Sequence, residues 1–418
     1  MALIVQKFGG TSVGDCERIQ HVATLVKREA AAGHQVIVVV SAMAGVTNQL
    51  VDYCQTMNSL MTPEAQANYD HVVSSGEQIT SGLLALALES LGLKARAWCG
   101  WQLPLRSDNM YSKARIDVIE TAAIHASFAR GEIAVVAGFQ GITAEGRIST
   151  LGRGGSDTSA VALAAAFGAD RCDIYTDVDG VYTCDPRIVK RAQKLHRVSY
   201  EEMLEMASLG SKVLQTRSVE LAMNYGVKVQ VLSTFDDRPA DSIPGTLLVD
   251  EEEIVEKHRV TGIAYSRDEA RVTLTNVENR PGVSAGLFGP LAEAGINVDM
   301  IVQNVTEDGK QTDITFTVGK TDLARALDIV KHDKRVPKCD SVHSDAGVAK
   351  VSVIGVGMRS HAGVAAEMFR TLAEKNINII VISTSEIKTS VLIDESYLEL
   401  ALRALHTAYG LDAAEEKN

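Results

Sequence analysis

The stretch Thr150-Leu151-Gly152-Arg153-Gly154-Gly155-Ser156-Asp157-Thr158-Ser159 decides how the chain is interpreted. It precedes a run of small apolar residues, 160–166, that is typical of a packed helix. Glycine allows a sharp turn and a close approach to a ligand, and the free N–H groups of a helix N-terminus attract anions. Arg153 adds a planar donor that fits a carboxylate or a phosphate. Taken alone, the stretch is compatible with an anion site and with a glycine-rich turn that binds nothing.

The composition is that of a globular chain with two or three domains. The 418 residues are 46% hydrophobic but only 5% aromatic, which suits α/β layers packed with small side chains. The formal net charge of −12 argues against a nucleic-acid surface. The six cysteines include no CxxC pair, which fits reduced thiols in a cytoplasmic protein without a zinc site. No apolar run is long enough to span a membrane.

Apolar runs alternate with helical patterns in the N-terminal half of the chain. Strands are predicted at 2–6, 36–40, 133–139, 173–177 and 227–232. Helices are predicted at 15–31 and 48–57, with another after Gln78. This alternation predicts a mainly parallel sheet covered on both faces. Ligands bind beyond the carboxyl ends of such strands, where the sequence has polar or glycine-rich segments at 7–11, 41–47, 138–141 and 176–179.

Two of these segments have both a structural and a functional interpretation. Lys7 precedes Gly9 and Gly10, so its ammonium either reaches a phosphate held by glycine N–H groups or extends into water from a strand end. Neither a Walker A nor a GxGxxG pattern is present. The segment 176–187 lacks the glutamate that an EF-hand has at its twelfth position. It forms either a pair of β-turns or a nucleotide-binding loop.

The C-terminal part contains an internal repeat. Gly282 and Gly363 lie 81 positions apart, as do Phe288 and Phe369. The first copy predicts strand, helix, strand, strand and helix at 271–275, 283–294, 297–304, 312–318 and 323–332. The second copy predicts the same order at 350–355, 364–375, 378–384, 389–393 and 397–408. This order is typical of the ferredoxin-like split βαβ arrangement.

The second copy is too short to supply its own last strand. Only 411–414 precede the acidic tail, whereas 260–264 precede the first copy and have no counterpart. We therefore expect 260–264 to form the missing edge strand of the second copy and 338–342 to complete the first. The stretch 235–259, which has prolines and an acidic run, is expected to be a linker with a short acidic helix.

Together these motifs resemble the aspartokinase family. The resemblance is carried, in order, by Lys7-Phe8-Gly9-Gly10-Thr11-Ser12, 41–47, 75–77, 137–141, 150–157 and 175–187. It implies an α/β protein with an amino acid kinase fold, in three layers with a mainly parallel sheet, followed by two ferredoxin-like βαββαβ ACT domains. The implied limits are 1–235 for the catalytic domain, 236–259 for the linker, 265–343 for the first ACT domain, 260–264 plus 344–413 for the second, and 414–418 for the tail.

The resemblance also implies a reaction: transfer of a phosphoryl group from ATP, with Mg²⁺, to the side-chain carboxylate of L-aspartate. It implies catalytic roles for Lys7, Arg153 and Asp157. It implies contacts to ATP from Lys7, Phe8, Gly9, Gly10, Ser41, Thr176, Asp177, Tyr182, Arg187 and Lys212. It implies contacts to aspartate from Thr47, Glu77, Arg153, Gly154, Gly155 and Ser156. No protein residue is assigned as a metal ligand.

ACT domains imply regulation by free amino acids, here lysine and threonine as feedback inhibitors of their own biosynthesis. They also imply a homo-oligomer, a dimer or tetramer, joined through these domains, with no nucleic-acid or membrane partner. Effector contacts are expected from Asn279, Arg280, Pro281, Gly282, Asn297, Val298, Asp299, Gln303, Ser360, His361, Ala362, Gly363, Asn378, Ile379, Ser383, Thr384, Ser385 and Glu386. Asp299 or Glu386 would pair with the effector ammonium; the alternative is that these polar groups cap turns.

Two other functions are compatible with parts of the sequence. One is a non-catalytic amino-acid sensor built on a kinase-like fold, which the set Lys7, Arg153, Ser156 and Asp157 argues against. The other is a kinase of the same fold acting on glutamate, acetylglutamate, carbamate or UMP. The paired ACT domains and the surroundings of Glu77 favour aspartate over these substrates.

Overall fold

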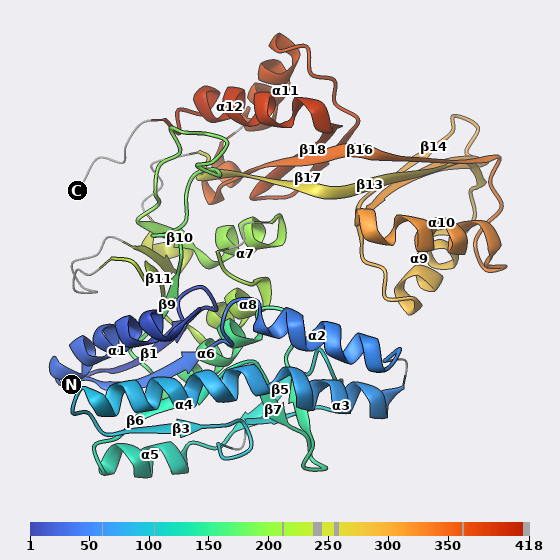
Figure 1. Ribbon diagram of the computed structural model, residues 1–418. Coiled ribbons are helices and arrows are strands. Elements are labelled where there is room, and N and C mark those ends of the chain that lie inside the picture. The colour runs from blue at the N-terminus through green and yellow to red at the C-terminus, as the bar shows by residue number, and fades with distance from the viewer. Residues whose placement is uncertain are drawn as a thin grey trace. The chain divides into compact units, whose positions relative to one another are not determined.

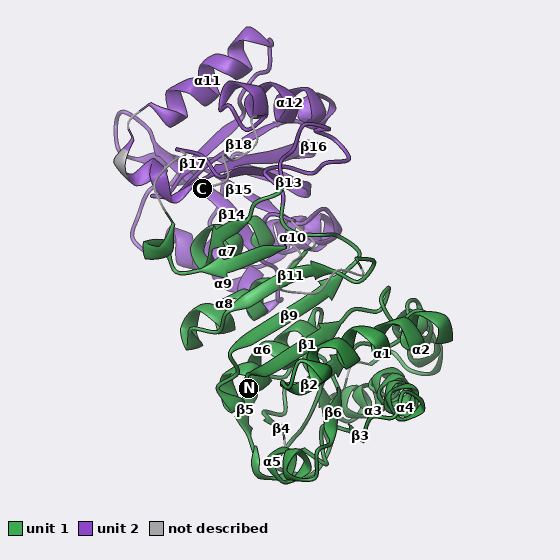
Figure 2. Ribbon diagram, turned by 90° about the vertical axis from the view of Figure 1, so that its left-hand side faces the viewer, with its two compact units in different colours: residues 1–181, 194–208, 212–255 green, residues 182–193, 209–211, 256–418 purple. Residues whose placement is uncertain are grey.

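The computed structural model (Figure 1) describes residues 1–60, 62–103, 105–210, 213–236, 245–254, 259–361 and 363–412. The chain forms two compact units (Figure 2): unit 1 contains 1–181, 194–208 and 212–255, and unit 2 contains 182–193, 209–211 and 256–418. Lys212, Ala362, much of the expected linker and the expected tail lie outside the described residues. No helix in the described part is long and apolar enough to cross a membrane.

Unit 1 is built on an eight-stranded sheet with the order β10-β12-β11-β9-β1-β2-β6-β3. The strands are β1 (Leu3–Phe8), β2 (Gln35–Val40), β3 (Ala95–Trp98), β6 (Ile133–Ala137), β9 (Arg171–Thr176), β10 (Arg197–Ser199), β11 (Val229–Ser233) and β12 (Thr246–Val249). Every neighbouring pair is parallel except β11 and β12, so the predicted parallel sheet is confirmed. Three strands of this sheet were not predicted: β3, β10 and β12, of which β12 lies within the stretch expected to be a linker. The short acidic helix expected in that stretch is the 3-10 turn Glu251–Glu253.

Helices cover both faces of this sheet. They are α1 (Cys16–Ala31), α2 (Val46–Met57), α3 (Pro63–Val73), α4 (Ser75–Ser90), α5 (Ala122–Ala129), α6 (Gly155–Phe167), α7 (Tyr200–Ser208) and α8 (Thr216–Tyr225). On one face, Phe8 of β1 packs with the buried sides of α1 and α4 in a single core. Lys7, its neighbour, points to the opposite face because side chains alternate along a strand. There it meets Asp157 of α6, so the two helix layers lie on opposite sides of β1.

A second, four-stranded sheet in unit 1 was not predicted. Its order is β5-β4-β7-β8, with β4 (Leu105–Ser107), β5 (Ile116–Ile119), β7 (Gln140–Ile142) and β8 (Ile148–Thr150). Strands of three or four residues leave little periodicity in a sequence, which is why these were missed. The sheet matters for the site because β8 ends at Thr150, the first residue of the glycine-rich stretch.

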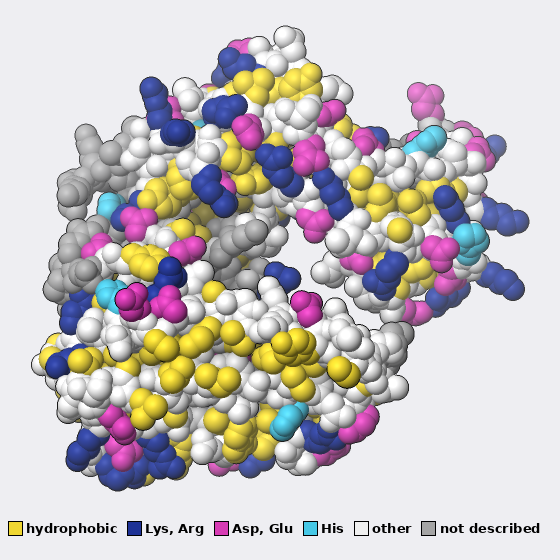
Figure 3. All heavy atoms as spheres, in the orientation of Figure 1, with side chains coloured by type: hydrophobic (Ala, Val, Ile, Leu, Met, Phe, Trp, Pro, Cys, Tyr) yellow, Lys and Arg dark blue, Asp and Glu magenta, His cyan; other side chains and the backbone are white. Residues whose placement is uncertain are grey.

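One surface of unit 1 exposes apolar side chains. Ile79 and Leu86 on α4 are 58% and 63% exposed, and Tyr53 and Met57 on α2 are 56% and 83% exposed. Figure 3 shows hydrophobic side chains gathered on the face that these helices present. Contiguous apolar surface of this kind is typical of protein–protein contacts.

Unit 2 is built on a six-stranded antiparallel sheet with the order β14-β15-β13-β16-β18-β17. The strands are β13 (Gly262–Glu278), β14 (Val298–Val305), β15 (Gln311–Val318), β16 (Ser341–Ile354), β17 (Val381–Thr384) and β18 (Lys388–Asp394). The helices are α9 (Val283–Glu293), α10 (Leu323–His332), α11 (Val364–Glu374) and α12 (Leu398–Ala408). The repeated order of strands and helices is therefore the one predicted from the two copies.

The two copies exchange strands, and the exchange runs through β13 and β16. Residues 262–266 of β13 pair with 350–354 of the second copy, whereas 271–275 pair with 341–345 at the other end of β16. The expected pairing of 260–264 with the second copy is thus present from Gly262 onward. Ile263 is buried in the second copy's core together with residues of α11 and α12. One long strand therefore supports both cores.

This exchange predicts where a core substitution acts. Ile263→Ala should destabilise the second copy by about 3 kcal/mol, because it leaves a cavity in that copy's core. Hydrogen exchange should then speed up in α11 and α12 and remain slow in α9 and α10. The control is Ile314→Ala, which lies in the core of the first copy and should give the reverse pattern. Faster exchange in α9 and α10 for Ile263→Ala would contradict the assignment.

Candidate active site

Four adjacent parallel strands, β9, β1, β2 and β6, end at one edge of the large sheet. Backbone hydrogen bonds join the segments that follow them. Gly9 donates to Tyr175 O at 3.3 Å, Ala44 donates to Gly10 O at 3.1 Å, and Gly138 donates to Val40 O at 3.0 Å. The prediction that these segments share one edge is confirmed, as expected for a ligand site of an α/β sheet.

A buried ion pair lies at this edge. Lys7 Nζ is 2.6 Å from Asp157 Oδ1, and the two residues are only 9% and 7% exposed. Gly9 borders the ammonium so closely that a Cβ there would lie 3.3 Å from Lys7 Nζ. The absence of a side chain at Gly9 thus leaves the backbone next to a buried positive charge.

The N-terminus of α6 lies within the glycine-rich stretch. Its N-cap is Gly154, with φ of 71°, and no side chain caps the first turn. Only glycine fits there, because a Cβ would overlap the side chain of Gln215. The first N–H groups of a helix have no intrahelical acceptor and favour an anion. Ser156 lies buried in this turn, and exposed Arg153 has no ion-pair partner among the residues that the structure describes.

Asp70 supports this stretch and was not predicted. Its carboxylate is fully buried and accepts hydrogen bonds from Thr150 N at 2.7 Å, Thr150 Oγ1 at 2.8 Å and Ser112 N at 2.9 Å. Burial raises the pKa of Asp70, and these hydrogen bonds oppose the rise. The available signal was a carboxylate at helical spacing between Ala67 and Val73, the other buried residues of α3.

A second support comes from α8, whose contribution the sequence also did not reveal. Arg217 donates from Nη1 to Leu151 O at 3.0 Å. Burial lowers the pKa of Arg217. The glycine-rich stretch is therefore held at Thr150 from α3 and at Leu151 from α8, which fixes the position of Arg153 two residues later.

Glu77, in the first turn of α4, is buried with one carboxylate oxygen unused. It is 3% exposed, and its Oε1 accepts a hydrogen bond from Ala42 N at 3.0 Å. Its Oε2 has no hydrogen-bond partner in the described part of the chain. Burial raises the pKa of Glu77 to about 7, against the effect of the Ala42 bond. Such a carboxylate is suited to bind an ammonium group, whose charge would compensate its burial.

The remaining predicted ATP and aspartate contacts are distributed between the two units. Phe8 is buried and stacks on Tyr175 at 4.7 Å, so only its backbone is available to a ligand. In unit 1, Thr176 Oγ1 lies 3.1 Å from Asp177 Oδ1, and Ser41 and Thr47 are half-buried. Tyr182 and Arg187 belong to unit 2. Arg187 is 81% exposed at its side chain and pairs with Asp185 at 2.8 Å.

The predicted effector residues lie mostly at the starts of helices and along β14 and β17. Gly282 and Gly363 are the N-caps of α9 and α11, both in the left-handed conformation with φ of 92° and 103°. Asn279 donates to Gly309 O at 2.9 Å. Gln303 accepts from Ser284 at 3.2 Å. β14 and β17 are the two outermost strands of the six-stranded sheet, but Met300, Val302 and Val381 pack in one hydrophobic cluster. The two groups of expected contacts therefore lie near each other.

The two acids expected to bind an effector ammonium both have basic partners. Asp299 Oδ2 lies 2.5 Å from Nζ of buried Lys350, which also lies 2.7 Å from Glu269 Oε1. Glu386 lies 3.3 Å from Arg359 and its side chain is 81% exposed. An effector ammonium at Asp299 would therefore share that carboxylate with Lys350, whereas Glu386 is paired only at the surface.

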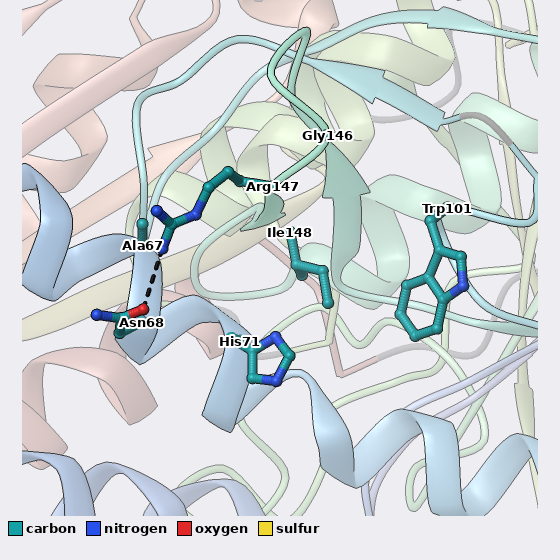
Figure 4. Close-up of a pocket in the computed structure, with 7 residues that line it drawn as sticks. All are labelled: Ala67, Asn68, His71, Trp101, Gly146, Arg147 and Ile148. Atoms are coloured by element: carbon teal, nitrogen blue, oxygen red, sulfur yellow. Dashed lines mark hydrogen bonds between the residues drawn. The ribbon is translucent and has the colours of Figure 1, made fainter.

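A groove of about 380 Å³ lies between α3 and the turn joining β7 and β8 (Figure 4). It is lined by Ala67, Asn68, His71, Trp101, Gly146, Arg147 and Ile148. Arg147 donates to Asn68 at 3.0 Å and to Glu64 at 2.7 Å. Among the described residues, none of those predicted to contact substrate lines this groove, so the chemistry is expected elsewhere.

Comparison with known proteins agrees with this geometry. Residues 2–233 match the Amino acid kinase family, and 271–331 and 351–409 each match the ACT domain. The chain is 52% identical to aspartate kinase Ask_LysC of Stutzerimonas stutzeri and 53% identical to the aspartokinase of Pseudomonas aeruginosa, covering 99% of this chain and 98% of each relative. The chain belongs to the aspartokinase family. It is thus an aspartate kinase with ACT regulatory domains, as the resemblance implied.

Solved aspartokinases share the fold. Escherichia coli aspartokinase III in complex with aspartate and ADP superposes with a TM-score of 0.79 at 26% identity, over 97% of this chain and 99% of that one. The same enzyme in complex with lysine and aspartate superposes with a TM-score of 0.74 at 27% identity, over the same shares of the two chains. The predicted fold, an amino acid kinase domain followed by two ACT domains, is confirmed.

The buried position of Glu77 predicts a pH dependence of stability. Its folded-state pKa of about 7 lies above the usual 4.5, so ionised Glu77 destabilises the fold at high pH. This penalty, about 3 kcal/mol, should disappear as the pH falls through 7 toward 4.5. Glu77→Gln removes the titration, so urea unfolding should show wild type gaining stability relative to this variant between about pH 8 and about pH 5.

The control is Glu89→Gln, at an exposed position on the same helix. It should follow wild type at every pH. If the free energy of unfolding differed by the same amount between wild type and Glu77→Gln at every pH in that range, burial would not raise the pKa of Glu77.

Proposed function

We propose that this aspartokinase transfers the γ-phosphoryl group of ATP to the side-chain carboxylate of L-aspartate, forming 4-phospho-L-aspartate at the edge of the large sheet. The observation that carries the proposal is the buried Lys7–Asp157 pair beside the uncapped N-terminus of α6. The reaction must bring two anions together, and the Lys7 ammonium lies at the point where strands β1, β2, β6 and β9 end.

The protein must offset the repulsion between the aspartate carboxylate and the γ-phosphate of ATP. A carboxylate with a reference pKa of ~3.9 is already ionised at neutral pH, so the acceptor needs no general base. Two unit charges ~4 Å apart repel by ~4 kcal/mol at an effective dielectric near 20. The Lys7 ammonium and the α6 N-terminus would offset this repulsion by fixed positive charge, which is the main contribution of a protein to phosphoryl transfer.

We assign the ends of aspartate to separate groups. Glu77 would bind the ammonium through Oε2, which is supported by the absence of a partner for that oxygen in the described residues. Arg153 and Ser156, with Gly154 and Gly155, would bind the α-carboxylate at the α6 N-terminus, and Thr47 would complete the contacts. Lys7, Gly9, Gly10 and Ser41 would contact the phosphates, and Thr176, Asp177, Tyr182, Arg187 and Lys212 would contact the rest of the nucleotide.

Mg²⁺ fits this site as a companion of ATP. The described residues contain no cluster of three or more histidine, cysteine, aspartate or glutamate side chains that could hold a metal by themselves. Mg²⁺ is usually held by one or two carboxylates together with substrate phosphates, and Asp157 and Asp177 are carboxylates at this edge. When bound, Mg²⁺ would neutralise phosphate charge.

We further propose that lysine, threonine or both inhibit the enzyme through the ACT domains, as end products of the pathway that begins with this reaction and also leads to methionine. Support comes from the two ACT matches and from the lysine complex of the Escherichia coli relative. The protein would act in the cytoplasm as a homo-oligomer joined through these domains. The domain limits stated above stay a prediction.

Lys7→Ala tests the catalytic assignment. Turnover should fall by at least about a hundredfold, because a charge that stabilises the transferring phosphoryl is lost. The measurement is aspartate-dependent ADP formation, with circular dichroism and a thermal melt to verify the fold. Lys27→Ala, an exposed lysine on α1, is the control and should match wild type.

Two results would count against the proposal. Turnover of Lys7→Ala within about tenfold of wild type would remove Lys7 from the chemistry. Equal turnover with glutamate and aspartate would overturn the choice of substrate.

A separate titration identifies the effector. Lysine and threonine are added to the reaction, each alone and then together, and the loss of turnover is measured.

Glu386→Gln tests the effector site. The concentration of lysine or threonine that halves each variant's own uninhibited rate should rise about tenfold or more, since an ammonium partner is lost. Glu374→Gln, exposed on α11 of the same ACT copy, is the control and should be inhibited like wild type. Asp299→Asn should show a smaller rise, because Lys350 already occupies that carboxylate. Unchanged inhibition in both Glu386→Gln and Asp299→Asn would exclude these acids.

A further inference from the structure

The segment 182–193 connects β9 to β10 of the kinase sheet but is part of unit 2. Cys184 and Val189 are 3% and 4% exposed and are buried in the core of the second ACT copy. Ile263 of β13 donates its N–H to Thr183 O at 2.7 Å, and Tyr265 donates its hydroxyl to Asp185 at 3.0 Å. The segment is therefore built into the ACT core by both apolar packing and hydrogen bonds.

A buried histidine from the last helix holds Thr183 by its side chain. His406 of α12 is 0% exposed; its Nε2 lies 2.9 Å from Thr183 Oγ1, and its Nδ1 lies 2.6 Å from Asp412 Oδ1. Gln193 N donates to the same Thr183 oxygen at 2.9 Å.

The directions of these hydrogen bonds follow from the groups involved. An ionised carboxylate only accepts, so His406 donates from Nδ1 to Asp412. In the tautomer with a proton on Nδ1 alone, Nε2 accepts from the Thr183 hydroxyl, which itself accepts from Gln193 N. Each group has a single role in this chain, so the side chain of Thr183 has one fixed orientation.

Thr183 directly follows Tyr182, one of the residues assigned above to the nucleotide. The other end of this part of the chain is fixed at the catalytic edge, because Gly9 donates to Tyr175 O near the end of β9. Tyr182 lies only a few residues beyond that point, between an anchor in the kinase sheet and an anchor in the ACT core.

We propose that His406 is a positioning residue for ATP: through Thr183 it fixes the segment that carries Tyr182 and Arg187. The proposal rests on the proposed function in one respect, that these two residues contact the nucleotide. It goes beyond that function because it assigns a role in nucleotide binding to a histidine of an ACT helix, which lies 223 positions after Thr183 in the sequence.

Two substitutions of the same histidine separate the two hydrogen bonds. His406→Asn places an amide nitrogen near the Nδ1 position, so it keeps the bond to Asp412 and loses the acceptor for Thr183. His406→Gln places an amide oxygen near the Nε2 position and keeps the acceptor for Thr183. Thr183→Val and Thr183→Ser form the matching pair at the other end, losing and keeping the hydroxyl.

The expected result is a selective effect on the nucleotide. His406→Asn and Thr183→Val should raise KM for ATP and the Kd for ADP, measured by calorimetry, about tenfold. KM for aspartate and kcat should stay within about twofold, and His406→Gln and Thr183→Ser should bind nucleotide within about twofold of wild type.

Tyr409→Phe provides the control for general loosening of α12, because it removes the hydrogen bond from Tyr409 to Val364 O of α11 and keeps the aromatic ring in the core. If it raises the Kd for ADP as much as His406→Asn does, the proposal is wrong. The proposal is also overturned if His406→Asn and Thr183→Val lower the melting temperature but leave nucleotide affinity unchanged.

Should His406→Asn fail to fold, the comparison of Thr183→Val with Thr183→Ser decides whether the Thr183 hydroxyl, which both His406 and Gln193 N contact, positions the nucleotide segment. The ADP titration measures nucleotide affinity without turnover, so it tests the positioning role of His406 even in an inactive enzyme. If the wild-type chain formed no ADP in the presence of aspartate, the proposed function would be refuted, and the ADP titration would still decide the role of His406.

Discussion

A buried ammonium–carboxylate pair is the constraint on which the catalytic unit depends. Lys7 comes from β1 and Asp157 from α6, so their contact joins the sheet to the helix whose N-terminus has no side-chain cap. Removing one partner from a buried pair costs about 3–5 kcal/mol, because the other charge is left uncompensated. Asp157 therefore holds the Lys7 side chain in place at this edge. A phosphate at this edge would then meet an ammonium whose burial has already been compensated.

The same kind of constraint recurs in unit 2 with a different consequence. Lys350 of β16 is buried between Glu269 of β13 and Asp299 of β14, so one ammonium links three strands of the ACT sheet. Asp299 has the side chain expected for an effector site, but its charge is already needed by Lys350. Buried charge thus supports the architecture of both units, and the amino group of an effector is better matched by an acid, such as Glu386, that is paired only at the surface.

The sequence predicted those features whose signal is local. Glycines at 152, 154 and 155 and the apolar strand runs predicted the sharp turn before α6 and the shared sheet edge, because backbone conformation and alternation depend on neighbouring residues. The strand exchange was predictable because the second copy lacked its last strand, whereas the strand-like segment 260–264 before the first copy had no counterpart. The supports of the site were not predictable in this way. Asp70 holds Thr150 across 80 positions, and no spacing in the sequence indicates that contact.

The division of the proposed ligand contacts between the units has a consequence for regulation. Glu77 and Arg153, the proposed aspartate contacts, belong to unit 1. Asp70 and Arg217, which hold the stretch just before Arg153, belong to the same unit. Tyr182 and Arg187 are carried by a segment whose anchors, β13 and α12, belong to the ACT sheet and its helices. An effector acts only through a difference in affinity between two arrangements of the protein. A rearrangement of the second ACT copy would reach the nucleotide contacts through the segment that it contains, whereas the aspartate contacts have their own supports. Inhibition that begins in the ACT domains is therefore expected to act first on the nucleotide.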